Sequence, residues 1–268
     1  MMNEETSTIS TADSDAPIPP ARWRRLRRYN LLMGVLHLVQ GIAILALATD
    51  LALPVTATFM EGPPGTPAVF TELFSVSIAW GVAVFLFMSA AAHFILTFPG
   101  VFGWYRGNLL ATRNIARWIE YAFSASLMVV LIAMLTGISD VAALIAIGGV
   151  NASMILFGWL MERYERPGRP NWLPYWFGVI AGAFPWIVIG IYLFSPTTDA
   201  SPPGFVYAIF FTIFVFFNTF SVNMVLQYRR VGPWRSYLFG ESAYILLSLV
   251  AKSALAWQVF AGTLAPPS

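Results

Sequence analysis

Lys252 is the only lysine in this chain of 268 residues, and it lies inside an apolar segment that extends from residue 237 to residue 261. The other fourteen basic residues are arginines, which lie in hydrophilic stretches or in the first turns of apolar ones. A charged side chain near a bilayer centre costs at least about 3 kcal/mol, so a chain rarely keeps one without a use. Because a lysine amine can lose its proton and condense with an aldehyde, the sequence predicts a covalently held carbonyl ligand at Lys252.

A positive charge on a buried Lys252 requires a negative partner, since an unpaired charge in apolar surroundings is expected to neutralise. The candidate partner is Glu120, in the stretch RNIARWIEYAFSAS. If the two helices begin near residues 107 and 236, a rise of about 1.5 Å per residue places Glu120 about 20 Å and Lys252 about 24 Å along their helices. Ser248 lies one helical turn before Lys252, on the same face.

A different pairing is also open, because Arg117 lies three residues before Glu120 on the same predicted helix. That pairing leaves the charge on Lys252 without a partner. We therefore expect Arg117 to pair with Glu241, which lies nearer the start of the last predicted helix.

The composition indicates the elements that position these residues. Hydrophobic residues make up 58% of the chain and charged residues only 10%, with a mean hydropathy of +0.70. Because soluble domains carry about 25% charged residues, we expect a multi-pass protein of the cell membrane. After a disordered tail at 1–20, seven segments are each long enough to span a bilayer, which predicts an all-α seven-helix bundle in a domain at 21–262. These segments are 29–49, 72–98, 107–136, 139–161, 174–194, 203–228 and 236–261.

The arginines predict the orientation of the bundle. All fourteen lie before the first segment, between the second and third, between the fourth and fifth, between the sixth and seventh, or just inside those boundaries. The loops at 50–71, 137–138 and 195–202 and a short external tail at 263–268 contain no Arg or Lys. The positive-inside rule therefore predicts a cytoplasmic N-terminus and an external C-terminus. The loop 50–71 has room for a short hairpin, although its Pro and Gly content argues against a long one.

Several classes of function are disfavoured. The chain has no cysteine and only two histidines, and it lacks the sequence patterns of metalloproteases, calcium loops and nucleotide-binding loops, so we expect no metal site. The arginines are better explained as topology determinants than as a nucleic-acid surface.

Taken together, the motif SLVAK in the seventh segment, RWIEY in the third, and seven spans with a cytoplasmic N-terminus resemble the heliorhodopsins. These are retinal-binding membrane proteins whose orientation is opposite to that of other rhodopsins, and the resemblance covers about residues 22–262. It implies all-trans retinal bound as a Schiff base to Lys252, with Glu120 as counterion and Ser248 as a hydrogen-bonding neighbour. In the pumping microbial rhodopsins the position one turn before the lysine is an aspartate, and here it is Ser248. The resemblance further implies a homodimer.

The two histidines lie at similar depths on neighbouring predicted helices. Helical rise places His37 about 12 Å and His93 about 9 Å from the cytoplasmic side. One interpretation is a pair of structural interhelical hydrogen bonds. The other, implied by the resemblance, is a polar cytoplasmic cavity, with Arg117 and Glu241 nearby, that receives the Schiff-base proton after illumination.

The resemblance also supplies candidate walls for a polyene-binding pocket, drawn from the third to the sixth segments. They are Tyr121, Ser124, Ser126, Asn151, Met154, Pro185, Trp186, Phe217 and Asn218. Most of the 22 Phe and 10 Trp residues are expected to face lipid or pack helices, whereas the intramembrane amides Asn151 and Asn218 need a partner. Pro185 removes a backbone hydrogen bond and should kink its helix.

Together with these observations, the resemblance implies a light-sensing membrane protein with a slow photocycle, an unknown signalling partner and no enzymatic activity. A pump is disfavoured because no second carboxylate beyond Glu120 is expected deep in the membrane. One alternative is a transporter or light-gated channel that uses the Lys252–Glu120 pair as a proton or substrate site. A membrane enzyme with Lys252 as an amine catalyst is a weaker alternative, because no companion acid–base cluster is evident.

Overall fold

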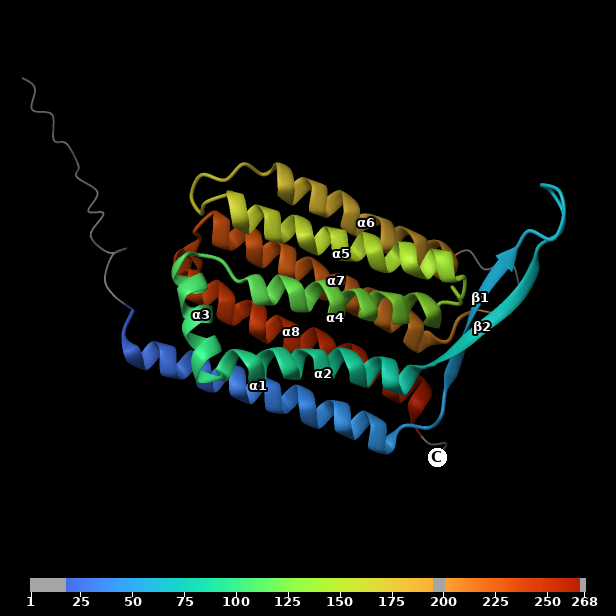
Figure 1. The fold of residues 1–268 in the computed structure, drawn as a ribbon, viewed down its shortest axis with the longest axis horizontal. Helices are drawn as coiled ribbons and strands as arrows, with labels where there is room; N and C mark the ends of the chain where they lie inside the picture. The colour runs from blue at the N-terminus through green and yellow to red at the C-terminus, as the bar shows by residue number, and fades with distance from the viewer. Residues whose placement is uncertain (1–17, 195–200, 266–268) are drawn as a thin grey trace, which may run out of the picture.

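The computed structural model describes residues 18–194 and 201–265, so most of the predicted N-terminal tail lies outside the described residues. Figure 1 shows long helices that run side by side along the long axis, with a β-hairpin projecting from one end. Within the described residues, seven helices are long and apolar enough to cross a membrane. They are α1 (Pro20–Leu47), α2 (Ile78–Thr97), α4 (Ile115–Leu135), α5 (Val141–Tyr164), α6 (Leu173–Phe194), α7 (Gly204–Tyr228) and α8 (Tyr237–Val259).

Polar side chains and prolines define where several helices begin. The Ser77 hydroxyl accepts a hydrogen bond from the backbone N–H of Trp80, and the Asp140 carboxylate accepts one from Ala143, so both residues cap a helix that would otherwise expose unpaired N–H groups. Helix α1 begins at Pro20, nine residues before the predicted segment, because proline suits the first helical turn and the arginines that follow are good helix formers.

The helices form a closed bundle around an apolar core. Helix α1 packs against α2 and α8, α2 packs against α4, and α5 lies between α4 and α6, while α7 packs on α8. Helices α6 and α7 meet through aromatic side chains, in which Trp186 contacts Phe210, Phe214 and Phe217 edge to face. The largest buried cluster includes Ile44, Phe85 and Val259 and occupies the half of the bundle nearer the hairpin.

The hairpin is longer than the sequence predicted, so the fold is mostly helical and not all-α. Strands β1 (Ala52–Phe59) and β2 (Val69–Ser77) pair antiparallel, with a register shift between Val55 and Thr56. Residues 72–77 were predicted to be helical and belong to β2 instead. Thr56 fixes the hairpin to the α4–α5 loop, because its N–H donates to the Ser139 carbonyl at 2.9 Å.

The predicted third segment is divided into two helices. Helix α3 (Pro99–Leu110) ends before a turn in which Thr112 has a φ of 54°, and α4 begins at Ile115 with Asn114 as its cap. The predicted start near residue 107 is therefore wrong. A smaller difference occurs at the other end of the chain, where a π-helical turn (Phe260–Leu264) continues α8 into the predicted tail.

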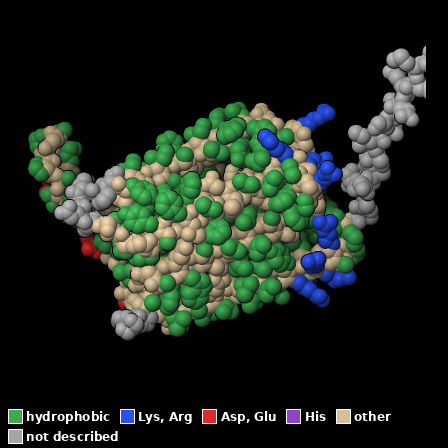
Figure 2. All heavy atoms as spheres, turned by 180° about the vertical axis from the view of Figure 1, so that it is seen from behind, with side chains coloured by type: hydrophobic (Ala, Val, Ile, Leu, Met, Phe, Trp, Pro, Cys, Tyr) green, Lys and Arg blue, Asp and Glu red, His purple; other side chains and the backbone are tan. Residues whose placement is uncertain are grey.

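Charged and apolar side chains separate along the molecule. In Figure 2 the Lys and Arg side chains gather at one end, and hydrophobic side chains cover the middle. Many large apolar side chains of this middle zone are exposed, among them Leu32, Ile42, Phe123 and Ile187. An exposed apolar surface of this extent is expected where the protein contacts lipid acyl chains.

Candidate functional site

Lys252 lies inside the bundle and donates hydrogen bonds to three side-chain oxygens. Its Nζ is 2.7 Å from Glu120 Oε1, 2.6 Å from Ser89 Oγ and 3.1 Å from Ser248 Oγ. The side chains of Lys252 and Glu120 are only 4% and 10% exposed. Ser89 also donates to Glu120 Oε1, at 2.6 Å. Because α2, α4 and α8 each contribute to this group, the ion pair exists only in the folded bundle.

Ser89 is a component of this site that sequence reasoning missed. It lies on α2, four residues before His93, and is 1% exposed. A lone serine in an apolar segment is common, since its hydroxyl can bond to the carbonyl one turn earlier on its own helix. The only available signal was its spacing from His93 on one helix face.

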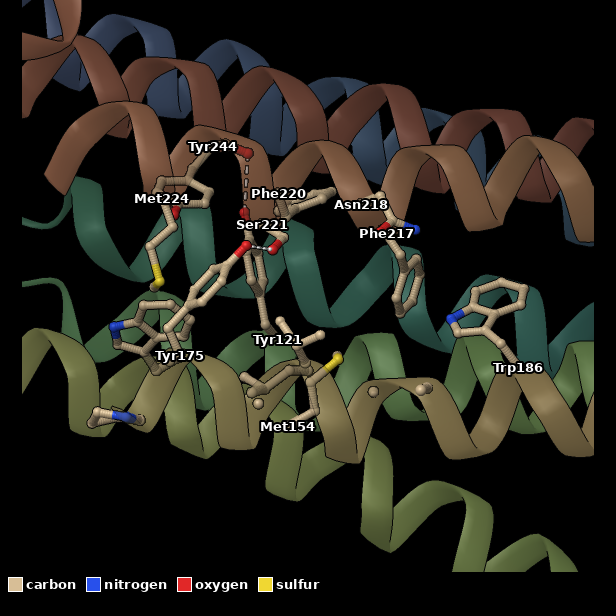
Figure 3. A pocket seen from close by; sticks show the side chains of 18 of the residues that line it. Tyr121, Met154, Tyr175, Trp186, Phe217, Asn218, Phe220, Ser221, Met224 and Tyr244 are labelled. Carbon is tan, nitrogen blue, oxygen red and sulfur yellow. Dashed lines mark hydrogen bonds between the residues drawn. The ribbon is translucent and has the colours of Figure 1, made fainter. Parts of the chain in front are cut away.

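An apolar cavity of about 300 Å³ lies close to the lysine, although Lys252 itself does not line it. Figure 3 shows the side chains around this cavity. The Tyr121 side chain lies between Lys252 and the cavity: its ring centroid is 5.3 Å from Lys252 Nζ, and the same residue lines the cavity. The Tyr121 hydroxyl donates to the Tyr244 carbonyl at 3.0 Å, which fixes the ring across α4 and α8. The volume lies at the low end of the range for small-molecule sites, and the mostly apolar walls suit a polyene.

The structure brings five of the predicted wall residues to this cavity. These are Tyr121, Met154, Trp186, Phe217 and Asn218. Figure 3 shows Met154 on one side of the cavity and Phe217 and Trp186 toward one end. Sequence reasoning missed Gly182, which also lines the cavity and where an added Cβ would collide with the Met154 side chain. Glycine at this position leaves room that a larger residue would occupy.

The remaining predicted wall residues do not line the cavity. Asn151 donates to Ser126 Oγ at 3.1 Å and so joins α5 to α4. Ser124 is fully buried, and its hydroxyl has no hydrogen-bond partner among the described residues. Pro185 lies inside α6 next to Trp186. Asn218, in contrast, is one of the five residues that line the cavity, and its side-chain amide donates to the Phe214 carbonyl of its own helix at 2.8 Å.

A second buried charge cluster surrounds Arg117. Its guanidinium donates to Glu241, as predicted, and also to Glu162 Oε1 at 2.6 Å. The guanidinium lies over the ring of Tyr244, with the Arg117 Cζ atom 4.0 Å from the ring centroid. Glu162 and Glu241 are 4% and 0% exposed, so Glu120 is not the only buried carboxylate, although these two lie near the ends of α5 and α8. Sequence reasoning did not identify Glu162, which lies near the end of α5 and is buried.

The two acidic residues of this cluster are hydrogen-bonded through all four carboxylate oxygens. Glu162 accepts from the Tyr237 hydroxyl at 2.6 Å, the Asn114 N–H at 2.7 Å and the Trp118 indole. Glu241 accepts from Asn114 Nδ2 at 2.7 Å. Two carboxylates and one guanidinium would carry a net negative charge if all are ionised, which makes Arg117 essential to the cluster.

A small cavity of about 40 Å³ lies between the two charge clusters. Glu120 and Glu241 both line it, together with His93 and Tyr105. Burial raises the pKa of Tyr105, on α3, to about 12, so the phenol keeps its proton at neutral pH. The volume is sufficient for a few water molecules.

The two histidines lie face to face at one side of this region. Their rings are stacked with centroids 5.7 Å apart. His93 Nδ1 lies 2.9 Å from Asn30 Oδ1, whereas neither ring nitrogen of His37 has a hydrogen-bond partner among the described residues. Only His93 lines the small cavity. Of the two interpretations, the pair of interhelical hydrogen bonds is reduced to one bond, between His93 and Asn30, together with ring stacking. The polar cavity has His93 but not His37 in its wall, and its role in accepting a proton stays a prediction.

A seven-helix bundle with a buried lysine–carboxylate pair beside an apolar cavity defines a rhodopsin-type membrane protein. The sequence model of the heliorhodopsin family matches residues 26–264, and the chain belongs to this family. It is therefore a retinal rhodopsin and a multi-pass integral membrane protein.

Among solved structures, the fold is similar to that of a light-driven proton pump, LR (Mac), from Leptosphaeria maculans. The TM-score is 0.62 with 16% sequence identity, and the alignment covers 91% of this chain and 95% of the pump. At this identity the likeness concerns the fold alone. No curated protein matches the chain.

Proposed function

We propose that this protein is a light sensor that holds all-trans retinal as a Schiff base on Lys252 and does not pump ions. The observation that carries the proposal is the buried contact of Lys252 with Glu120, Ser89 and Ser248 beside an apolar cavity. Retinal would supply a polyene that absorbs visible light and isomerises. The protein's own residues would hold it and control the proton on the lysine nitrogen.

Glu120 is the residue best suited to hold that proton. In a protonated Schiff base the lysine nitrogen has a single proton to donate. Of the three oxygens around Nζ, only that of Glu120 carries a charge. Hydrogen bonds to a charged acceptor are about twice as strong as neutral ones. Ser89 stabilises the carboxylate by donating to it. Ser248 is then a neutral neighbour and not a second counterion.

The polar and apolar halves of the bundle support sensing over pumping. The buried acidic, basic and histidine side chains lie at Lys252 or on the Arg117 side of it. The cluster that contains Ile44, Phe85, Met128 and Val259 occupies the other half, and no acidic, basic or histidine side chain is buried there among the described residues. A pump or channel needs groups that pass protons or ions across both halves, so this core also disfavours the alternative of a transporter or light-gated channel.

We also propose that the N-terminus is cytoplasmic, the C-terminus is external and the photocycle is slow. Intact cells that express the chain should expose a tag placed after Ser268 and conceal one placed before Met1. Illumination of the same cells, supplied with retinal, should produce no protonophore-sensitive change in the pH of the medium. An exposed N-terminal tag would contradict the orientation. A sustained pH change absent from cells without retinal would contradict the sensor proposal.

A homodimer and a separate signalling partner complete the proposal. Native mass spectrometry of the protein extracted with its lipids distinguishes one chain from two, and a monomer under those conditions would contradict the dimer.

Glu120→Gln should change both the colour and its pH dependence in the retinal-loaded protein. Removing the negative charge destabilises the protonated nitrogen, so the loss of the visible band should occur about one to three pH units lower than in the wild type. The fraction that remains protonated should absorb at longer wavelength, because the nearby carboxylate stabilises the ground state preferentially. Absorption spectra across a pH titration measure both effects.

Glu72→Gln is the matched control, because it removes an exposed carboxylate on β2 that bonds only to Ser75. It should leave the spectrum and the titration unchanged. If Glu120→Gln also retains the wild-type colour and titration, the counterion lies elsewhere, and Glu241 or a bound anion becomes the candidate.

A further inference from the structure

A basic groove lies where the first turns of α1 meet α3, at the arginine end of the bundle. Two adjoining cavities, of about 500 and 270 Å³, share Arg24 and Arg27 in their walls. Arg28 completes the first and Arg106 the second. No described acidic residue lines either cavity. Positive charge thus accumulates in a hollow, where a ligand can touch several arginines at once.

Contacts of their guanidinium groups hold two of these arginines in position. Arg27 lies over the Phe102 ring, 5.7 Å from its centroid, and its Nε donates to the Thr97 carbonyl at 2.8 Å. Arg106 lies 5.0 Å from the ring centroid of Trp23, which is itself buried. Within residues 18–194 and 201–265, the terminal amino groups of Arg27 donate no hydrogen bond, so they can donate to an acceptor in the groove. An arginine fixed in this way loses little conformational entropy when it binds an anion.

The described ion pairs do not involve these arginines. Each of the ion pairs formed within residues 18–194 and 201–265 uses Arg117 or Lys252 as its cation. Topology alone requires only that arginines lie on the cytoplasmic side, and it requires neither a groove nor side chains stacked on aromatic rings. The arrangement therefore fits recognition of a negatively charged group, and the planar guanidinium is well matched to a phosphate.

The groove continues into the lipid-facing surface. Leu31 and Phe98 line the larger cavity and are 48% and 61% exposed. From Leu31 an exposed apolar stripe follows one face of α1 through Val35, Val39 and Ile42. A ligand that touches both the arginines and this stripe must be anionic at one end and apolar along the other. A soluble phosphate or a nucleic acid would not use the apolar part.

We propose that this groove binds an anionic phospholipid, with its phosphate between Arg24 and Arg27 and an acyl chain along Leu31 and Phe98. Basic pockets next to membrane helices on the cytoplasmic side are a recurring way to hold such headgroups. The proposal does not depend on retinal, on the counterion or on the photochemistry.

The test measures binding of phosphatidylglycerol to the full-length protein in phosphatidylcholine nanodiscs, by native mass spectrometry across a lipid titration. The double variant Arg24→Gln/Arg27→Gln should bind phosphatidylglycerol about thirtyfold more weakly, since each arginine near an anionic lipid contributes about a factor of five. Arg166→Gln/Arg169→Gln is the matched control, because it removes the same charge from the α5–α6 loop and lines neither cavity. It should weaken binding by no more than about threefold. Circular dichroism and thermal unfolding verify that both variants are folded.

Three results would overturn the proposal. Equal losses in the two double variants would indicate general attraction between basic residues and an anionic surface. Equal occupancy by phosphatidylcholine would indicate an apolar groove without headgroup recognition. Displacement of phosphatidylglycerol by millimolar inorganic phosphate would indicate a site for a soluble anion.

Discussion

Lys252→Ala should abolish the visible absorption band that forms when the protein is supplied with retinal. The chain contains no other lysine that could replace it, and its Nζ lies 5.3 Å from the ring centroid of Tyr121, which lines the apolar cavity. The expected loss is complete, because free retinal absorbs in the near ultraviolet and the visible band requires the protonated link to nitrogen. Absorption spectra of the purified protein after addition of retinal measure this directly.

The substitution also leaves Glu120 buried without its cation, which could unfold the bundle and remove the colour for a trivial reason. Lys252→Ala/Glu120→Gln removes both charges together and is expected to fold and remain colourless. Reduction of the loaded wild type with borohydride, followed by peptide mapping, should place the retinyl group on Lys252. A coloured Lys252→Ala protein, or a retinylated peptide that lacks this residue, would contradict the proposed link.

The ion pair could be predicted because its residues are scarce. One lysine and one deep carboxylate in segments of similar orientation leave few possible pairs, and the contact of Lys252 with Glu120 follows even though α4 begins later than expected. Ser89 was not predictable in the same way, because a serine in an apolar helix carries no charge to be balanced. Glu162 was missed because residues near a helix end are usually solvated, whereas packing of α5 against α4 buries this one.

The differences in the helix boundaries have local physical causes. The apolar composition continues from residue 107 to residue 136, so hydropathy predicts one helix. The break occurs because Thr112 adopts a positive φ and Asn114 caps a new helix. Similarly, β2 is apolar enough to resemble the start of a span, and Ser77 marks the point where α2 begins. Hydropathy identifies the bundle, but single capping residues decide where its helices start.

The cavity walls show what spacing alone cannot decide. Tyr121, Met154 and Phe217 line the cavity, whereas Ser124 and Asn151 lie near Tyr121 and Met154 in the sequence and do not line it. Which side of a helix faces a ligand depends on its rotation in the bundle. In a membrane helix that is apolar on all faces, periodicity gives little information about this rotation.

Arg117→Gln should lower the free energy of unfolding by about 3–5 kcal/mol, the usual effect of removing one partner of a buried ion pair. The effect is expected to lie at the upper end of this range, because Glu162 and Glu241 both lose their cation and remain buried. Unfolding of the purified protein by a denaturing detergent, followed by circular dichroism, measures the change.

Arg113→Gln is the matched control. Arg113 lies in the turn between α3 and α4, is only partly buried, and bonds to Asn108 without a carboxylate. This substitution should lower the free energy of unfolding by about 1 kcal/mol or less. The triple variant Arg117→Gln/Glu162→Gln/Glu241→Gln removes the excess negative charge and should recover part of the lost stability, because neutral amides at these positions can still hydrogen-bond to Asn114 and Tyr237. If the triple variant is less stable than Arg117→Gln, the repulsion between the two carboxylates is not what makes Arg117 necessary. In that case the packing of the guanidinium on Tyr244 and Trp118 becomes the explanation.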